Sequence, residues 1–259
     1  YLQRADLLRQ ARAGSRAEYE FLRLRCAVYI NQGRFADEQH DADAAVRIAQ
    51  ALGDDGALMF SVQQRIWIAL FSGQYDAIQT DIDSLRSVAE RARQDQFLAW
   101  ARAYGAAVSR LRGGLGGALS DLNSAIGLGR RAHDLFFELY ALSQRARVCV
   151  DLRAWGDARA DVDAALGLYQ LTPMLAYGVL DAIHGLVDVC FALMLQAPPV
   201  IRLAQRQRLL RAIAFQKKLA RHLVIARSIA AGAQARLARL DAGQAEGDRD
   251  AADRRRGER

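Results

Sequence analysis

Proline and cysteine are both scarce in this sequence of 259 residues. Only three prolines occur, and two of them are adjacent, so little interrupts a chain rich in the helix formers alanine, leucine and arginine. The three cysteines, Cys26, Cys149 and Cys190, are irregularly spaced and lie in apolar helical patterns. We therefore predict small core residues in a reducing, cytoplasmic compartment, without a disulfide framework.

Patterns typical of strands and of membrane-spanning helices are also missing. Runs of Val, Ile and Thr that alternate with polar residues do not occur, so strands are not expected. No stretch reaches about 18 consecutive uncharged apolar residues, which a membrane span requires. The nearest one, 174–197, is interrupted by Asp181, His184 and Asp188. We interpret it as a buried helix, with a membrane segment as the alternative.

Short catalytic and cofactor-binding motifs are missing as well. The sequence has no His-Glu-x-x-His, Cys-x-x-Cys or Gly-x-Ser-x-Gly. The glycine-rich stretch 112–117 lacks the lysine that a phosphate-binding loop needs, so we interpret it as a turn. We predict that the protein is not an enzyme and binds no cofactor. A catalytic triad assembled from distant residues leaves no such motif and is the alternative.

Two groups of acidic residues with a histidine are candidates for metal binding. The first follows i, i+3, i+7 spacing, so its side chains share one helix face. We interpret both groups as contacts between helices or as exposed helix edges, and we predict no metal site. The groups are Asp181, His184 and Asp188, and His40 with Asp37, Glu38 and Asp41.

The positive charge is concentrated near the C-terminus. Residues 200–259 contain 15 Lys or Arg against 6 Asp or Glu, whereas residues 1–199 contain 21 against 23. Clustered positive charge can bind phosphate backbones, but these charges spread around the expected helix and few aromatics lie among them. We favour a solvated face, and nucleic-acid binding is kept as an alternative. The basic side chains are Arg202, Arg206, Arg208, Arg211, Lys217, Lys218 and Arg221.

A turn motif recurs every 40 residues, and aspartates follow most copies at fixed distances. Each copy is flanked by apolar residues near helical spacing, so each unit consists of two helices joined by the turn. A single pair would leave an apolar stripe in water, and stacked neighbours cover it. The pattern predicts an all-α solenoid of antiparallel helix pairs with a period of 40. The copies are Gly33-Arg34-Phe35, Gly73-Gln74-Tyr75, Gly113-Gly114-Leu115 and Ala154-Trp155.

The regular units occupy residues 1–170. Residues 1–13 align with the second helix of a unit, so we expect this chain to be a piece of a longer protein. We expect the turn aromatics Phe35, Tyr75 and Trp155 to pack between the two helices of their units. The predicted helices are 17–32, 37–52, 57–72, 76–93, 96–112, 118–132, 135–153 and 157–170, with turns at 33–35, 73–75, 113–117 and 154–156.

The period is lost after residue 171. We expect an irregular helical unit over 171–243, followed by a charged tail or terminal helix over 244–259. The helices predicted within it begin at Pro173, after the Pro198-Pro199 pair and near Val224, and the last ends before a turn at Gly243.

The turns resemble the Gly-Asp-Tyr-x-x-Ala core of tetratricopeptide repeats. The period of 40 exceeds the usual 34, the closing proline is absent and the first-helix Trp and Leu signature is blurred. This longer form is similar to the arrays of large bacterial signal-transduction proteins, including ATPase-coupled transcription activators. The resemblance rests on Gly33-Arg34-Phe35, Gly73-Gln74-Tyr75-Asp76-Ala77, Trp155-Gly156-Asp157-Ala158, linkers such as Leu52-Gly53-Asp54, and the second-helix alanines Ala45, Ala125 and Ala165.

Arginine and aspartate also recur at fixed positions. Arg25, Arg65 and Arg145 share one first-helix position, where the resembled family places a core leucine. An inward arginine needs a partner, because an unpaired buried charge is costly. We predict Arg–Asp pairs between helices, with exposed arginines at a helix edge as the alternative. The aspartates share two positions: Asp41, Asp81, Asp121 and Asp161 at the first, and Asp43, Asp83 and Asp163 at the second.

The resemblance implies a binding surface, because the first helices of tetratricopeptide units line a concave groove. Aromatics with arginine are residue types that anchor interfaces. The alternative places Trp67, Phe71 and Trp100 in the core. The implied groove residues are Glu20, Arg23, Asn31, Gln63, Trp67, Phe71, Trp100, Arg110, Tyr140, Arg147 and Asp151.

These observations predict a non-catalytic interaction or sensing scaffold within a larger bacterial signalling protein. Its partner is expected to be a protein, a peptide or a neighbouring domain of the same chain. Binding in the array would bias how the neighbouring domains pack. The alternatives are a small-molecule effector sensor, which a closed aromatic-lined pocket would favour, and a nucleic-acid-binding array.

Overall fold

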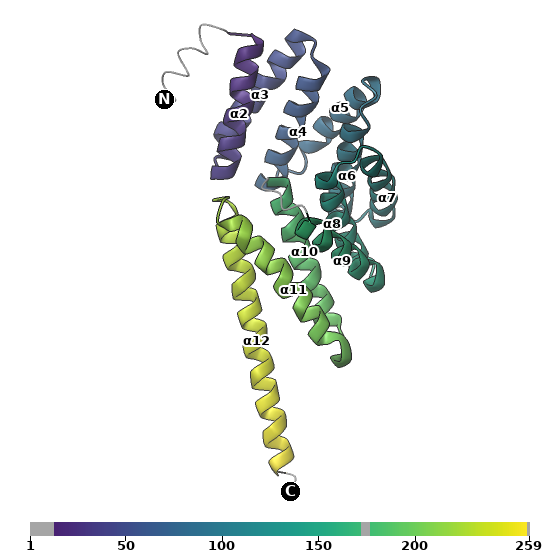
Figure 1. Cartoon of the computed structure of the whole chain (residues 1–259), viewed down its shortest axis with the longest axis vertical. Helices are drawn as coiled ribbons and strands as arrows, with labels where there is room; N and C mark the ends of the chain where they lie inside the picture. The colour runs from purple at the N-terminus through teal and green to yellow at the C-terminus, as the bar shows by residue number, and fades with distance from the viewer. Residues whose placement is uncertain (1–12, 172–176, 258–259) are drawn as a thin grey trace.

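The computed structural model describes residues 13–171 and 177–257, and all regular secondary structure in these two ranges is helical. Helices that are neighbours in sequence pack against one another, which gives an α-solenoid of antiparallel pairs (Figure 1). The regular pairs are α2 (Arg16–Gln32) with α3 (Phe35–Leu52), α4 (Asp55–Ser72) with α5 (Ile78–Arg91), α6 (Asp95–Leu111) with α7 (Leu115–Arg131), and α8 (Leu135–Asp151) with α9 (Trp155–Leu171).

The predicted period of 40 is confirmed by the helix starts. Helices α4, α6 and α8 begin at Asp55, Asp95 and Leu135, and three of the second helices keep the same step. The exception is α5, which begins at Ile78 because Tyr75 and the next two residues form a separate turn. The turn predicted at 113–117 is shorter than expected, since α7 already begins at Leu115 and the last two glycines lie in its first turn.

Helices α2 to α8 end in the same backbone arrangement, in which an N–H reaches back to the carbonyl five residues earlier. Arg34 N donates to Tyr29 O at 2.9 Å, and Gln94 N donates to Ala89 O at 2.9 Å. The residue before the donor adopts a left-handed conformation. Gly33 adopts this conformation at φ 73° without strain, because it has no Cβ. Arg93 adopts it at φ 54° although it has a Cβ, at a cost of about 1 kcal/mol.

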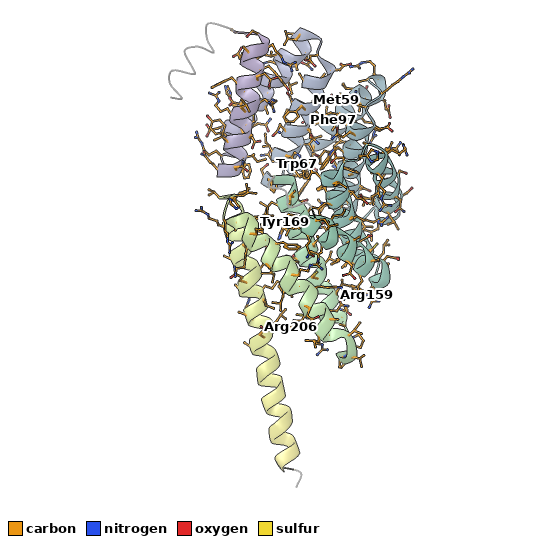
Figure 2. All side chains as sticks on the ribbon, viewed as in Figure 1. Met59, Trp67, Phe97, Arg159, Tyr169 and Arg206 are labelled. Atoms are coloured by element: carbon orange, nitrogen blue, oxygen red, sulfur yellow. The ribbon has the colours of Figure 1, made fainter. Side chains whose placement is uncertain are left out.

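An aromatic cluster forms the centre of the core between α4, α6 and α8. The rings of Trp67, Trp100, Tyr104 and Tyr140 lie with centroids 5.0 to 5.9 Å apart, mostly edge to face. Trp67 is 1% exposed and lies in the interior of the array (Figure 2). Trp67 and Trp100 therefore belong to the core, as the alternative interpretation of the sequence held.

The small residues and two of the three turn aromatics are packed as the sequence predicted, whereas the third aromatic is exposed. Ala45, Ala125 and Ala165 are buried, as their expected role in close helix packing requires. Phe35 stacks on Phe71 with centroids 6.4 Å apart, and Trp155 packs against the core. Tyr75 is 39% exposed, so the expectation that it packs between its two helices is wrong. The late start of α5 leaves it outside the helix pair.

The Arg–Asp pairs between helices are confirmed. Arg25 binds Asp41 through two nitrogens at 2.5 and 2.6 Å, and the same two-pronged contact recurs in the second and fourth units. In the third unit Gly105 replaces the arginine, and Asp121 is exposed instead of buried. The other two pairs are Arg65 with Asp81 and Arg145 with Asp161.

Arginines of the second and fourth units also contact the preceding unit. Arg65 lies 3.4 Å from Asp43, and Arg145 donates to Asn123 at 2.8 Å. Each of these guanidiniums therefore connects the two helices of its own unit and the unit before it, at the shared positions that the sequence pattern identified.

Three longer helices complete the described chain: α10 (Tyr177–Gln196), α11 (Pro199–Ala220) and α12 (Ala226–Gly257). The turn predicted at Gly243 is wrong, because α12 continues through it and extends beyond the rest of the molecule (Figure 1). A single glycine costs a helix only about 1 kcal/mol, which neighbouring helix formers offset. Residues 1–12 of the helix predicted over 1–13, and the start predicted at Pro173, lie outside the described residues.

Helix α10 departs from the regular stacking. It packs mainly on α8, the first helix of the fourth pair, and less on α9. Because the first helices form the inner side of the array, α10 lies on that side. Gly178 and Gly185 permit this approach: a Cβ on Gly178 would lie 2.8 Å from Trp67, and one on Gly185 would lie 2.6 Å from Ser143 Oγ. The C-terminal helices thereby cover part of the concave face.

Among the described residues one segment, Gly178–Gln196, is long and apolar enough to cross a membrane by length and composition. Within the described structure 72% of its most apolar stretch is buried against other helices. We therefore interpret α10 as a core helix, as the sequence favoured.

Candidate functional site

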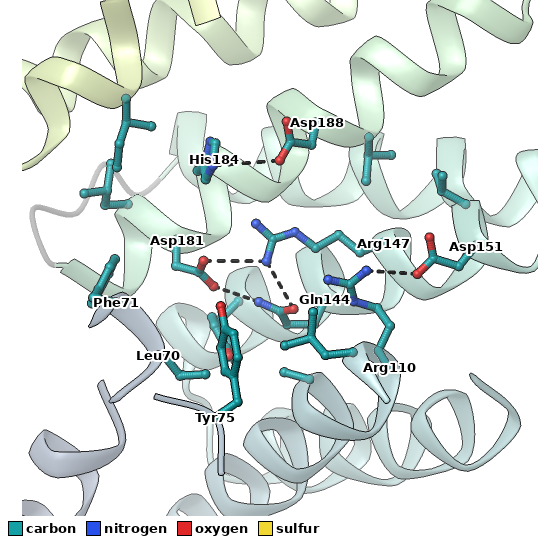
Figure 3. A pocket seen from close by; sticks show the side chains of 17 residues that line it. Leu70, Phe71, Tyr75, Arg110, Gln144, Arg147, Asp151, Asp181, His184 and Asp188 are labelled. Carbon is teal, nitrogen blue, oxygen red and sulfur yellow. Dashed lines mark hydrogen bonds and ion pairs between the residues drawn. The ribbon is translucent and has the colours of Figure 1, made fainter. Parts of the chain in front are cut away.

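A half-open cavity of about 470 Å³ lies between α10 and the part of the inner face of the array that α10 does not cover. The first helices α4, α6 and α8 form one wall, and α10 with Ile229 of α12 forms the other. Phe71 and Asp151 mark its two ends in the view of Figure 3. Its lining is Leu70, Phe71, Tyr75, Ala107, Arg110, Leu111, Tyr140, Gln144, Arg147, Val150, Asp151, Leu180, Asp181, His184, Asp188, Val189 and Ile229.

A triangle of polar side chains crosses the middle of the cavity between α8 and α10. Gln144 donates to Asp181 at 2.8 Å, and Arg147 lies 3.3 Å from Gln144 Oε1 and 3.5 Å from Asp181 (Figure 3). Arg147 is 16% exposed, so its charge depends on these partners. The triangle holds the inner faces of the two helices in a fixed relation.

Two further ion pairs flank this triangle. Arg110 of α6 donates to Asp151 of α8 at 2.9 Å, which joins consecutive units. On α10, Asp188 lies 3.8 Å from His184 Nε2 and accepts from Arg236 of α12 at 3.1 Å. The guanidinium of Arg236 also lies over the ring of Phe191, 4.1 Å from its centroid. These contacts fix α12 beside the cavity.

Two buried polar atoms of the lining have no hydrogen-bond partner among the described residues. They are the hydroxyl of Tyr140, a side chain that is 0% exposed, and Nε of Arg110. Burial, with the nearby carboxylate of Asp181, raises the pKa of Tyr140 well above its ordinary value. Its hydroxyl therefore stays protonated and can donate a hydrogen bond. Both donors lie beside the cavity but are buried and not exposed to it.

Five of the residues implied by the family resemblance lie together in this cavity, and six do not. Trp67 and Trp100 are buried within the aromatic core. Gln63 donates to the hydroxyl of Tyr104 at 3.0 Å and does not line the cavity. Glu20, Arg23 and Asn31 lie on α2, which contributes nothing to the lining. The five that line it are Phe71, Arg110, Tyr140, Arg147 and Asp151.

Half of the twelve remaining lining residues come from α10 and α12, which lie outside the predicted groove. Asp181, His184 and Asp188 were identified as sharing one helix face, and the structure turns that face toward the array. Each has a protein partner, and among the described residues no group of three His, Cys, Asp or Glu side chains could hold a metal ion. Gln144 was missed, although its repeat position holds the buried Gln64 in the second unit.

The cysteines and the basic helix lie apart from this cavity. The three thiols are free and buried, and burial raises the pKa of Cys26 and Cys190 to about 12. On α11, Arg208 binds Asp163 through two nitrogens at 2.7 Å, and Arg206 binds Asp241 at 2.9 Å. Part of the basic charge is therefore used within the molecule.

No family model matches the chain, and no curated protein is significantly similar to it in sequence. Among solved structures the chain is similar to the crystal structure of the apo form of RapI, with a TM-score of 0.61 and 10% sequence identity. The likeness covers 77% of this chain and 69% of that one. At this identity it concerns the fold alone, and it agrees with a helical repeat solenoid.

Proposed function

We propose that the protein is a non-catalytic interaction scaffold that binds a short segment of polypeptide in the half-open cavity. The observation that carries this proposal is the convergence of α4, α6, α8, α10 and α12 on one concave site. The site combines apolar side chains with fixed polar groups, and it opens to solvent. A segment of a larger partner can enter a half-open site of this kind, whereas a closed pocket would exclude it.

The polar lining supports a ligand with many hydrogen-bonding groups. Arg110, Gln144, Arg147 and Asp181 are held by one another, so their positions are set before a ligand arrives. Preorganised groups lose little freedom on binding, which favours affinity. Repeat solenoids commonly use such concave surfaces for binding.

A small-molecule effector is the second candidate. The volume of about 470 Å³ falls within the range of about 300 to 1,000 Å³ found for small-molecule sites. Phe71 and Tyr75 supply aromatic surface to the lining. The openness of the site and its polar character favour the polypeptide segment.

We further propose that the array is a long-period relative of tetratricopeptide repeats and works in the cytoplasm within a larger bacterial signalling protein. The support is the recurring turn and its step of 40, the three free cysteines and the solenoid fold. Binding would act by fixing α10 and α12 against the array and so biasing how neighbouring domains pack. Nucleic-acid binding receives less support, because Arg206 and Arg208 of the basic helix are paired with aspartates.

The test is a binding screen against a library of nine-residue peptides with acetylated and amidated ends. We expect a subset to bind the wild-type protein and to lose binding when Leu111→Trp narrows the cavity. Leu111 lines the cavity and is 50% exposed, so a larger side chain there does not disturb the core. Leu52→Trp is the matched control, because Leu52 also ends a helix and is 44% exposed but lies outside the cavity.

Two results would count against the proposal. If no peptide in the library binds the wild-type protein, polypeptide binding is rejected. If peptides bind Leu111→Trp and Leu52→Trp equally well, the scaffold binds polypeptide at another surface.

A further inference from the structure

Helix α11 exposes one face along its whole length. Its buried side chains, such as Leu209 and Leu219, belong to the core. On the exposed side, residues recur at alternating steps of three and four, so they form a single stripe along the helix. We call this set the α11 stripe, and it consists of Val200, Leu203, Gln207, Leu210, Ala214, Lys217 and Arg221.

The two ends of the α11 stripe differ in character. The N-terminal end is apolar, and its side chains are open to solvent: Val200 is 92% exposed and Leu203 is 68% exposed. The C-terminal end is basic and consists of Lys217 and Arg221, with Lys218 beside them. The stripe therefore offers a row of apolar contacts that leads into a cluster of positive charge.

The basic end is not neutralised within the described part of the chain. The side chains of Lys217, Lys218 and Arg221 are exposed, and none forms an ion pair or a hydrogen bond with another described residue. Arg206 and Arg208, on other sides of the same helix, are by contrast paired with aspartates. Residues 189–240 contain ten Lys or Arg and no Asp or Glu. A carboxylate that pairs with the basic end has to come from elsewhere.

The width of the α11 stripe indicates what shape of partner it fits. Alternating steps of three and four give a narrow apolar seam, which is the pattern that packs against a second helix. Helices that lie in a membrane surface have a wider apolar face and commonly carry aromatic residues. The α11 stripe contains no aromatic residue, which also leaves no platform on which nucleic-acid bases could stack.

A second copy of this chain fits the stripe poorly. In a parallel pair the basic ends of the two stripes would meet, and close contact of like charges is unfavourable. In an antiparallel pair the basic end of each stripe, around Lys217, would lie against the apolar end of the other, around Leu203. A partner with carboxylates at one end is complementary to both halves.

From these features we propose that the α11 stripe docks an amphipathic acidic helix of a partner protein. The partner helix runs antiparallel to α11, as neighbouring helices of the array do. Its apolar residues lie opposite Val200, Leu203 and Leu210, and its acidic residues lie in its first turns, opposite Lys217 and Arg221. Acidic residues at that end also stabilise the partner helix through its macrodipole. This surface is separate from the cavity, so the inference goes beyond the proposed function.

The experiment measures binding of two labelled synthetic helices to the full chain by fluorescence anisotropy. The first peptide has about three heptads, with leucine at the a and d positions and glutamates in its first two turns. The second peptide has lysines in place of those glutamates. We expect saturable binding of the glutamate peptide that weakens as salt increases, and binding of the lysine peptide at least about tenfold weaker.

Two variants test the two ends of the stripe, each with a matched control. Leu203→Ser should weaken binding of the glutamate peptide about tenfold, whereas Leu52→Ser, at an exposed leucine of α3, should leave it unchanged. Lys217→Glu should weaken it about fivefold. Arg47→Glu makes the same change of charge at an exposed position of α3 and should have little effect.

The inference is overturned if the glutamate peptide does not bind, if both peptides bind equally well, or if Leu203→Ser and Lys217→Glu bind like the wild type. It is also overturned by two results that assign the stripe to something else. One is binding of phosphatidylglycerol vesicles, lost in both variants, without binding of the peptide. The other is a dimer of the protein that Leu203→Ser dissociates.

The inference and the proposed function can fail separately. Leu111→Trp narrows the cavity and should not change binding of the glutamate peptide, because Leu111 is not part of the α11 stripe.

Discussion

At the scale of single residues, Glu38 is the clearest exception to the repeat. Its side chain is 0% exposed, and neither carboxylate oxygen has a hydrogen-bond partner in the described part of the chain. The other units place Ile78, Ala118 and Ala158 at the same position, and all three are fully buried. Burial raises the pKa of Glu38 to about 8, so the acid is held neutral in an apolar site.

Glu38→Gln should change how stability depends on pH. The carboxyl binds its proton up to about pH 8 when folded, whereas in the unfolded chain it loses the proton near its ordinary pKa of 4.5. The folded state therefore binds more protons between these values, and wild-type stability falls as pH rises. Relative to the wild type, the variant should gain about 1 kcal/mol per pH unit from pH 5 to 8, measured by urea unfolding.

An exposed acid supplies the control for this measurement. Glu90→Gln should differ from the wild type by a nearly constant amount over the same pH range, because Glu90 is exposed. Cys26, the thiol beside Glu38, has its pKa raised to about 12 and does not titrate in this window. A pH-independent difference for Glu38→Gln would show that the carboxyl is not held neutral.

At the scale of helices, the Arg–Asp pairs fix how the two members of a unit meet. The pattern of charges identified the partners, and the structure adds that arginines of the second and fourth units also contact the preceding unit. Asp161 is 6% exposed at its side chain, and its hydrogen bond raises the pKa of Arg145. The helices are therefore joined by directional contacts as well as by apolar packing.

Asp161→Asn should destabilise the protein by about 2–3 kcal/mol, because it leaves the half-buried Arg145 without its carboxylate. Asp121→Asn changes the same repeat position in the third unit, where Gly105 replaces the arginine and the aspartate is exposed. That control should stay within about 0.5 kcal/mol of the wild type. Equal effects in thermal or urea unfolding would mean that the pairs contribute no more than surface charges.

At the scale of the whole molecule, α10 decides what kind of site the array has. By packing on the inner side of α8, it reduces a continuous concave face to one half-open cavity. Gly185 makes the approach possible, since any side chain there would collide with Arg147 and Ser143. The junction between the regular units and the C-terminal helices is therefore also the wall of the candidate site.

Gly185→Ala should disturb both the junction and the cavity. The new methyl group would displace Arg147 and separate α10 from α8, with a loss of about 1–3 kcal/mol in stability and weaker binding of the library peptides. Gly167→Ala, in α9, has no atom within 4 Å of the added Cβ and should stabilise by about 0.5–1 kcal/mol. Urea unfolding measures the change in stability of both variants. A Gly185→Ala variant as stable as the wild type would contradict the close packing.

The sequence by itself determined the elements and their period. Apolar spacing, turn glycines and recurring charges are local or repeat at a fixed step, so they predicted the helix pairs and the Arg–Asp contacts from residues such as Arg65 and Asp81. Only the tertiary structure decided the site. Gln144 and Asp181 meet because α10 leaves the period of 40 and packs onto α8. Such a contact occurs once and not in every unit, so the sequence carries no repeating signal for it.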